Sequence, residues 1–198
     1  MEDKEEDKEE QQPGRTPVII KLHPQPEEYV EAETAFLRAV GLCVTQWAFV
    51  DRQLFRLFRF GIGALTHRAA ILYYDQNTIG RRAGQINNLL KSAFEGPDNE
   101  SWLKKWESLH QRLRDLLPIR NAIAHQPVQR MGTSDGTKAI YVYAIYLEPY
   151  ARHLKENRNV YRDKESLNTD DLIQHSNDVN ALESDLCEFA NKIVEASR

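Results

Sequence analysis

The chain has 198 residues and a formal net charge of −4, and hydrophobic residues make up 41% of it. This length is enough for one domain with a full core. No run of 18 apolar residues occurs, which excludes a membrane-spanning helix, and the acidic N-terminus lacks the apolar segment of a secretory signal. Cys43 and Cys187 lie on or beside apolar helix stripes, which favours reduced thiols over a disulfide. We therefore expect a cytoplasmic protein without a membrane partner.

The charge is unevenly distributed along the chain. Residues 1–12 hold seven acids and two lysines, a net charge of −5, whereas residues 52–130 hold thirteen Lys or Arg and six Asp or Glu, a net charge of +7. Residues 131–198 hold eight bases and twelve acids, a net charge of −4. The basic middle region has two interpretations: it attracts a polyanion, or it faces the acidic C-terminal helix of its own chain.

The chain divides into three segments of different composition. Residues 1–16 are charged and polar, which predicts a disordered acidic tail. Residues 17–26 contain three prolines, so we expect an extended arm there rather than a helix. Residues 27–198 then carry helical periodicity over most of their length, and we expect them to form one helical domain.

A long first helix is predicted over residues 27–60. Its main apolar stripe steps by four and three residues through Phe36, Val40, Cys43, Trp47, Val50, Leu54 and Leu57. A second stripe has residues seven apart, at Leu37, Val44, Asp51 and Phe58. Asp51 is the polar exception in that second stripe, and it therefore needs a partner.

Three more helical regions and one hairpin follow. Residues 66–94 predict a second helix with a possible break at "DQNT", residues 100–126 a third that Pro127 ends, and residues 169–196 a last helix. Between the last two, residues about 128–148 contain a Gly/Asp/Ser turn and a β-branched and aromatic run, which predicts a β-hairpin. The fold class expected is all-α, a bundle of four to five helices with a small hairpin before the last helix.

The end of the third helix, "LLPIRNAIAHQP", holds the candidate site. The apolar stripe of this helix passes through Trp102, Trp106, Leu109, Leu113, Leu116, Arg120 and Ile123. An unpaired guanidinium in a core costs several kcal/mol. Arg120 therefore needs a carboxylate, a subunit boundary or a ligand, and Asp51 is the partner that we predict for it.

Neighbouring residues strengthen this interpretation. Asn121 and His125 are four apart and share a helix face, so the amide is placed to orient the imidazole. Pro118 removes one helical hydrogen bond and is expected to kink the helix, which would turn Arg120 and His125 toward a cleft. The alternative is an ordinary polar last turn in which His125 is satisfied by a backbone carbonyl.

The segment Arg120-Asn121-Ala122-Ile123-Ala124-His125 resembles the Arg-(x4–6)-His motif of the HEPN superfamily. The first-helix segment "WAFVDRQLFRLF" and the order of helices and hairpin are also similar, so the resemblance spans roughly residues 27–196. It implies a helical domain that forms a homodimer, with two motifs in one shared cleft, and metal-independent RNA cleavage. HEPN domains often act as toxins or in phage defence, which implies an antitoxin or regulatory protein as a further partner.

The resemblance also implies a role for each motif residue. Arg120 would bind the scissile phosphate, His125 would act as general base or acid, and Asn121 would orient the histidine or the phosphate. Asp51 would support the site as an orienting residue, with a purely structural ion pair as the alternative. RNA supplies its own nucleophile, the 2′-hydroxyl, so such a site needs only a proton shuttle and a fixed positive charge. No cofactor and no metal ion are expected.

Other candidates carry weaker signals. Lys104, Lys105, Arg114 and Arg130 are candidates for contacts with the RNA backbone, and a solvated helix face is the alternative for them. The tyrosines of the predicted hairpin either stack on bases or pack on the bundle. The remaining histidines, His23, His67, His110, His153 and His175, lack the clustering of a metal site, and we expect them on the surface or on helix faces.

Overall fold

The computed structural model describes residues 27–134, 139–146 and 166–196, so the predicted acidic tail and extended arm lie outside the described residues. Its elements, in chain order, are α1 (Glu27–Ile62), α2 (Thr66–Tyr74), α3 (Ile79–Ala93), a short 3-10 helix η1 (Pro97–Asn99), α4 (Glu100–His125), β1 (Val128–Ser134), β2 (Ala139–Tyr146), β3 (Ser166–Leu167) and α6 (Thr169–Ala196). The predicted fold class is confirmed: the described part is a helical bundle with a hairpin before the last helix. The possible break at residues 75–78 is also present, between α2 and α3.

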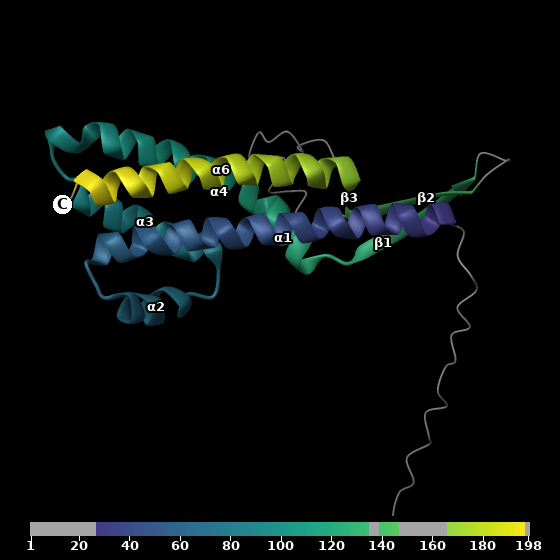
Figure 1. The fold of residues 1–198 in the computed structure, drawn as a ribbon, viewed down its shortest axis with the longest axis horizontal. Helices are drawn as coiled ribbons and strands as arrows, with labels where there is room; N and C mark the ends of the chain where they lie inside the picture. The colour runs from purple at the N-terminus through teal and green to yellow at the C-terminus, as the bar shows by residue number, and fades with distance from the viewer. Residues whose placement is uncertain (1–26, 135–138, 147–165, 197–198) are drawn as a thin grey trace, which may run out of the picture.

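Helices α1 and α6 run side by side along the length of the molecule (Figure 1) and form the most extensive helix contact in it. The Sγ of Cys43 donates to the carbonyl of Leu172 at 3.1 Å, and the guanidinium of Arg56 donates to Asn191 Oδ1 at 2.6 Å. Because the residue numbers rise together in both helices, α1 and α6 are parallel. Both cysteines are free thiols, as predicted, and burial raises the pKa of Cys43 to about 11.

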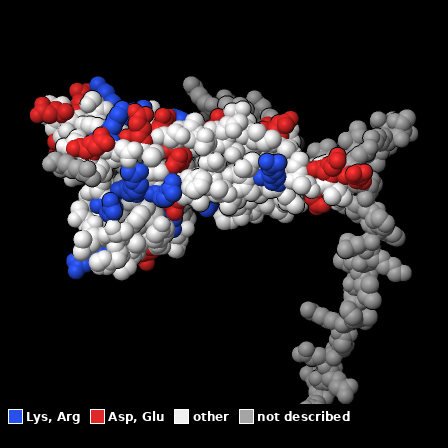
Figure 2. All heavy atoms as spheres, viewed as in Figure 1, with Lys and Arg blue, Asp and Glu red and all other residues white. Residues whose placement is uncertain are grey.

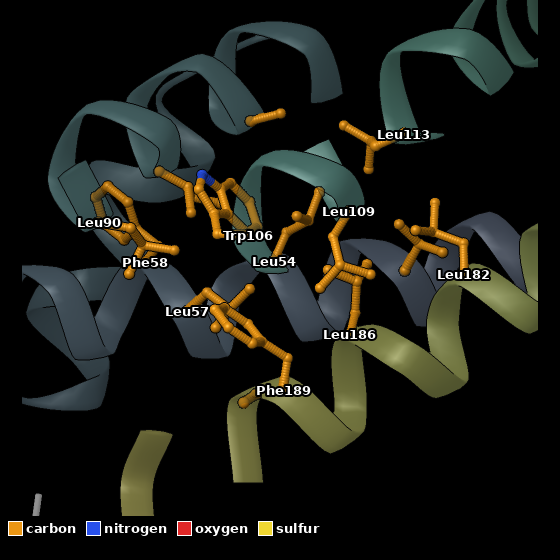
Figure 3. Close-up of a cluster of buried hydrophobic side chains, with 14 of the residues drawn as sticks. Leu54, Leu57, Phe58, Leu90, Trp106, Leu109, Leu113, Leu182, Leu186 and Phe189 are labelled. Atoms are coloured by element: carbon orange, nitrogen blue, oxygen red, sulfur yellow. The ribbon is translucent and has the colours of Figure 1, made fainter. Parts of the chain in front are cut away.

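The main core lies where α1, α3, α4 and α6 meet. Figure 3 shows side chains from these four helices converging on one another. They include Leu54, Leu57, Phe58, Leu90, Trp106, Leu109, Leu113, Leu182, Leu186 and Phe189, all buried. The apolar stripe predicted for the first helix forms the part of this core that belongs to α1. Its helical spacing keeps one side of α1 apolar, and that side packs against the other three helices.

A second, smaller core cluster lies at the other end of α1. It joins Phe36 and Cys43 of α1 to Ile119 and Ala122 of α4 and to side chains of the sheet and of the start of α6. Tyr143 of β2 is buried in this cluster, with its ring 6.1 Å from that of Phe36. The described tyrosine of the hairpin therefore packs on the bundle, which is the second of the two roles considered for the hairpin tyrosines.

The second stripe of α1 is covered over only half of its length. Phe58 and Asp51 face α2 and α3, whereas Leu37 and Val44 are 52% and 57% exposed. Gly41, between these two residues, and Ala48, four residues after Val44, are exposed as well. The four positions are therefore spaced by four, three and four residues. We call the four residues Leu37, Gly41, Val44 and Ala48 the outer face of α1. This apolar face has the spacing of a helix-packing surface but no helix of the described chain on it.

The hairpin is antiparallel, with Val128 opposite Ile145 and Ser134 opposite Ala139. This agrees with the predicted limits. A third strand, β3, joins it with Leu167 opposite Ile145. No strand was predicted at residues 166–167, because two residues are too few to show a detectable alternation.

Local signals set the helix ends. Gly63 takes a φ of +60°, a left-handed conformation that suits glycine, directly after α1. The side chain of Thr78 accepts from the backbone N–H of Arg81 and so caps α3. At the start of α6, Asn168 and Asp171 bond to each other's backbone N–H groups, which is a capping box.

Gly61 is expected to be required for the close approach of α1 and α3. A Cβ at position 61 would lie 2.9 Å from the Cβ of Leu89, whereas a Cβ at Gly84, also inside a helix, would meet nothing within 4 Å. Gly61→Ala should therefore destabilise the protein by about 1 kcal/mol, since overpacking outweighs the gain in helix propensity. Gly84→Ala should stabilise it by about 0.5–1 kcal/mol. Urea unfolding of both variants measures the contrast, and stabilisation by Gly61→Ala would contradict it.

Candidate active site

A pocket of about 330 Å³ opens between α1, the start of α3 and the end of α4. It lies at the junction of the two core clusters. Its apolar lining comes from Val44, Trp47, Ala48, Ile79, Ile123 and Ala124, and its polar lining from Asp51, Asn77, Arg82 and Arg120. Two of the predicted site residues, Asp51 and Arg120, therefore border the same pocket.

The partner of Asp51 is Arg82 rather than Arg120. The Arg82 Nη1 lies 3.0 Å from both carboxylate oxygens of Asp51, and the two side chains are only 15% and 19% exposed. The predicted ion pair between Asp51 and Arg120 is therefore wrong. The reason is geometric: Arg82 lies on the first turn of α3, directly opposite this part of α1, whereas Arg120 reaches the pocket from α4.

Arg82 is held rigidly at the pocket. Its Nε donates to the carbonyl of Gln76 at 2.9 Å, and its guanidinium lies 5.0 Å from the ring centre of Tyr73 and 5.1 Å from that of Tyr74. The hydroxyl of Tyr73 donates to Asp51 Oδ1 at 2.8 Å. Burial, together with the charge of Asp51, raises the pKa of Tyr73, so this hydroxyl keeps its proton.

Arg120 is half-buried and borders the pocket instead of the core. Its Nη1 donates to Asn121 Oδ1 at 3.2 Å, and among the described residues no carboxylate forms an ion pair with it. The helix continues through Pro118, but its buried side moves from the predicted Leu116 and Arg120 to Pro118, Ile119 and Ala122. That change of phase turns the guanidinium toward the pocket.

His125 ends α4, and its side chain is exposed and does not line the pocket. The hydrogen bond found at Asn121 goes to Arg120, so within one chain this amide orients the arginine and not the histidine. The structure thus brings Arg120 and Asp51 to one pocket. Asn121 contacts Arg120 but does not line the pocket, and His125 is exposed, directly after the lining residue Ala124.

No protein-family model, curated protein or solved structure matches the chain.

The weaker candidates do not gather at this pocket. Lys104 pairs with Glu100 and is exposed, as is Lys105. The two lysines lie about 15 residues before Arg120, which is roughly 23 Å along a helix. Arg114 is exposed on α4, and of Arg130 only the backbone position in β1 is described.

The basic middle region is partly neutralised by its own chain. Arg112 of α4 forms an ion pair with Asp185 of α6, and Arg82 pairs with Asp51. On the side of the molecule shown in Figure 2, charged side chains gather toward the ends, and the middle, over α1 and α6, is mostly uncharged. The predicted pairing with the acidic C-terminal helix therefore holds for Arg112, whereas Arg82 is neutralised by α1 and Arg120 pairs with no described carboxylate.

His175 lies behind the pocket wall and was not singled out from the sequence. It is fully buried on α6, and its Nε2 accepts from the indole N–H of Trp47 at 3.1 Å. Of the two positions expected for this histidine, the surface or a helix face, it takes the second, on the buried face of α6. A signal was present, since His175 lies three residues after Leu172 and four before Val179, in phase with the buried stripe of α6.

In the described ranges, no group of three His, Cys, Asp or Glu side chains is arranged to hold a metal ion. No helix among those residues combines the length and the apolar character needed to cross a bilayer.

Proposed function

We propose that the protein is an endoribonuclease that cleaves RNA without a metal ion, by general acid and base catalysis at a site shared between two copies of the chain. The observation that carries the proposal is the position of Arg120. Its guanidinium borders an open pocket and is oriented by Asn121. No described carboxylate balances its charge, because Asp51 forms its ion pair with Arg82. A guanidinium placed in this way suits a phosphate group.

The proposed chemistry uses the RNA's own 2′-hydroxyl as nucleophile. A histidine takes the proton of this hydroxyl, whose oxygen attacks the adjacent phosphorus. The bond to the 5′-oxygen breaks, a second histidine protonates that leaving oxygen, and the products are a 2′,3′-cyclic phosphate and a 5′-hydroxyl end. Arg120 stabilises the negative charge that develops on the phosphate oxygens.

One chain supplies one histidine of this kind, His125, so the scheme needs a second copy. The outer face of α1 offers the surface for it. Large and small residues alternate there, and Val44 and Ala48 continue directly into the pocket that Arg120 borders. A two-fold contact across this face would place the same residues of both copies beside one another.

The alternative is a dimeric module that binds RNA or a protein without cleaving it. The exposed position of His125, outside the pocket that Arg120 borders, favours this alternative. It shares the pocket and the outer face of α1 with the proposed enzyme and differs only in the chemical step.

The deciding assay is incubation of the purified protein with mixed RNA in EDTA. The expected result is cleavage, with fragments that carry 2′,3′-cyclic phosphate ends. A His125→Ala sample purified in parallel measures the background from contaminating nucleases. Binding of RNA with no cleavage above that background would favour the non-catalytic module. If the protein neither binds nor cleaves RNA, Arg120 is a structural residue.

Leu37→Asp is expected to weaken dimerisation at least tenfold, because it buries an unpaired carboxylate at the contact, at a cost of roughly 1.4 kcal/mol or more. Leu37 lies on the outer face of α1 but does not line the pocket, so the substitution leaves the site of one chain intact. The control is Ile71→Asp on α2, a residue that is 71% exposed and lies on another helix. Sedimentation of both variants measures the effect. A strictly monomeric wild type would exclude the shared site.

A further inference from the structure

We propose that the pocket between α1, α3 and α4 is a subsite for a nucleobase with an exocyclic amino group, and that Arg120 at its edge holds the phosphate attached to that nucleotide. The inference rests on the proposed function and deepens it, because it names which bases the site accepts beside the phosphate. The ligand is a ribonucleotide, either free or within an RNA strand.

The size and walls of the pocket suit one flat ring. Its volume of about 330 Å³ is at the small end of the range for ligand pockets. Aliphatic side chains of α1 and α4, among them Val44, Ala48 and Ile123, form apolar walls together with Trp47 and Ile79. Apolar and aromatic walls of this kind hold an unstacked base by burying its faces.

The charges divide the site into a neutral part and a cationic part. Asp51 and Arg82 are both at the pocket, and their ion pair cancels in net charge. The interior therefore suits an uncharged ring better than a phosphate. Arg120 is not balanced by any described carboxylate, so the edge that it borders suits the anionic phosphate. A nucleotide has this same division between its base and its phosphate.

The carboxylate of Asp51 sets the preference among the bases. An ionised carboxylate only accepts hydrogen bonds, and Asp51 receives them from Arg82 and Tyr73 while its side chain stays 19% exposed at the pocket. A base that offers an amino group can donate to it, as adenine, cytosine and guanine do. Uracil has no amino group, and the one donor on its Watson–Crick edge, the ring N3–H, lies between two carbonyl oxygens that the carboxylate repels. The Asn77 amide, which also lines the pocket, can donate to or accept from the same edge of the base.

Calorimetric titration with AMP, CMP and UMP tests the site directly, without any cleavage. For the wild type we expect AMP or CMP to bind at least tenfold more tightly than UMP, roughly the value of one hydrogen bond to a charged group. Asp51→Asn should abolish this preference, because the amide can donate to the uracil carbonyl. Asp75→Asn, which removes the same charge from an exposed residue that does not line the pocket, should retain it.

Asn77→Ala gives a second variant in case Asp51→Asn fails to fold, because it leaves the ion pair of Asp51 and Arg82 intact. It should weaken binding of the preferred nucleotide roughly fivefold or more. Absence of nucleotide binding, equal affinity for all three nucleotides, or a preference that survives in Asp51→Asn would overturn the inference.

Cleavage of short oligonucleotides separates this inference from the proposed function. Cleavage in EDTA that shows no base preference and is insensitive to Asn77→Ala would remove the base subsite and leave the ribonuclease proposal in place. Selective nucleotide binding without cleavage would remove the ribonuclease proposal and leave a nucleotide site.

Discussion

Replacing either His125 or Arg120 by alanine is expected to lower the rate of RNA cleavage by roughly 100-fold or more. One replacement removes the proposed proton shuttle, and the other removes the charge that stabilises the transition state. Arg120→Lys should recover little of the rate, because an ammonium lacks the planar fork that binds two phosphate oxygens. Initial rates on a fluorescent RNA in EDTA measure the loss.

Matched controls come from α2, where His67 and Arg68 are both exposed. His67→Ala and Arg68→Ala remove the same chemical groups from a surface away from the pocket, so both should cleave at the wild-type rate. Thermal unfolding and sedimentation show whether the site variants remain folded dimers. Wild-type cleavage by His125→Ala, or an equal loss of rate in the α2 controls, would contradict the assignment.

The buried His175 is expected to make the protein lose stability as the pH falls through the weakly acidic range. Burial lowers the pKa of His175 to about 4, below the ordinary value of 6.5. The folded protein therefore holds this imidazole neutral, while the unfolded chain takes up the proton once the pH falls below 6.5. This difference in proton uptake contributes about 3 kcal/mol to the free energy of unfolding. The contribution is fully present above pH 6.5 and is lost as the pH falls from 6.5 to 4.

His175→Gln isolates this contribution, because the glutamine oxygen can still accept from the indole N–H of Trp47. The difference in unfolding free energy between wild type and variant should fall by about 3 kcal/mol from pH 7 to pH 4. Urea unfolding across this range measures it. His67→Gln, at an exposed position, should behave like the wild type at every pH. A pH-independent difference for His175→Gln would show that the buried histidine does not couple folding to protons.

The periodic helices were predictable because burial follows the spacing of apolar residues. The residues Phe36, Cys43, Trp47, Val50, Leu54 and Leu57 of the predicted stripe are all buried. The break before α3 was predictable for a similarly local reason, since the segment of residues 75–78 favours turns and Thr78 caps the helix that follows. Such signals lie within a few residues of the feature that they determine.

The polar contacts were less predictable because they depend on where different helices face each other. The stripe of α1 shows that Asp51 is turned inward, but not that Arg82, 31 residues later, lies opposite it. Arg120 was correctly singled out as a residue that needs an explanation, yet its exact surroundings depend on the change of phase after Pro118. Sequence spacing thus identifies residues that need partners and leaves the choice of partner to the tertiary structure.

The parallel pairing of α1 and α6 has a consequence for the synthesis of the chain. The side chains that bond between these helices are 128 to 135 positions apart, so contacts of very long range close the bundle. A nascent chain that has not yet released α6 from the ribosome exposes the apolar side of α1 that Leu182, Leu186 and Phe189 later cover. The core is therefore completed only after α6 has left the ribosome, and until then the growing chain has the exposed apolar surface that chaperones bind.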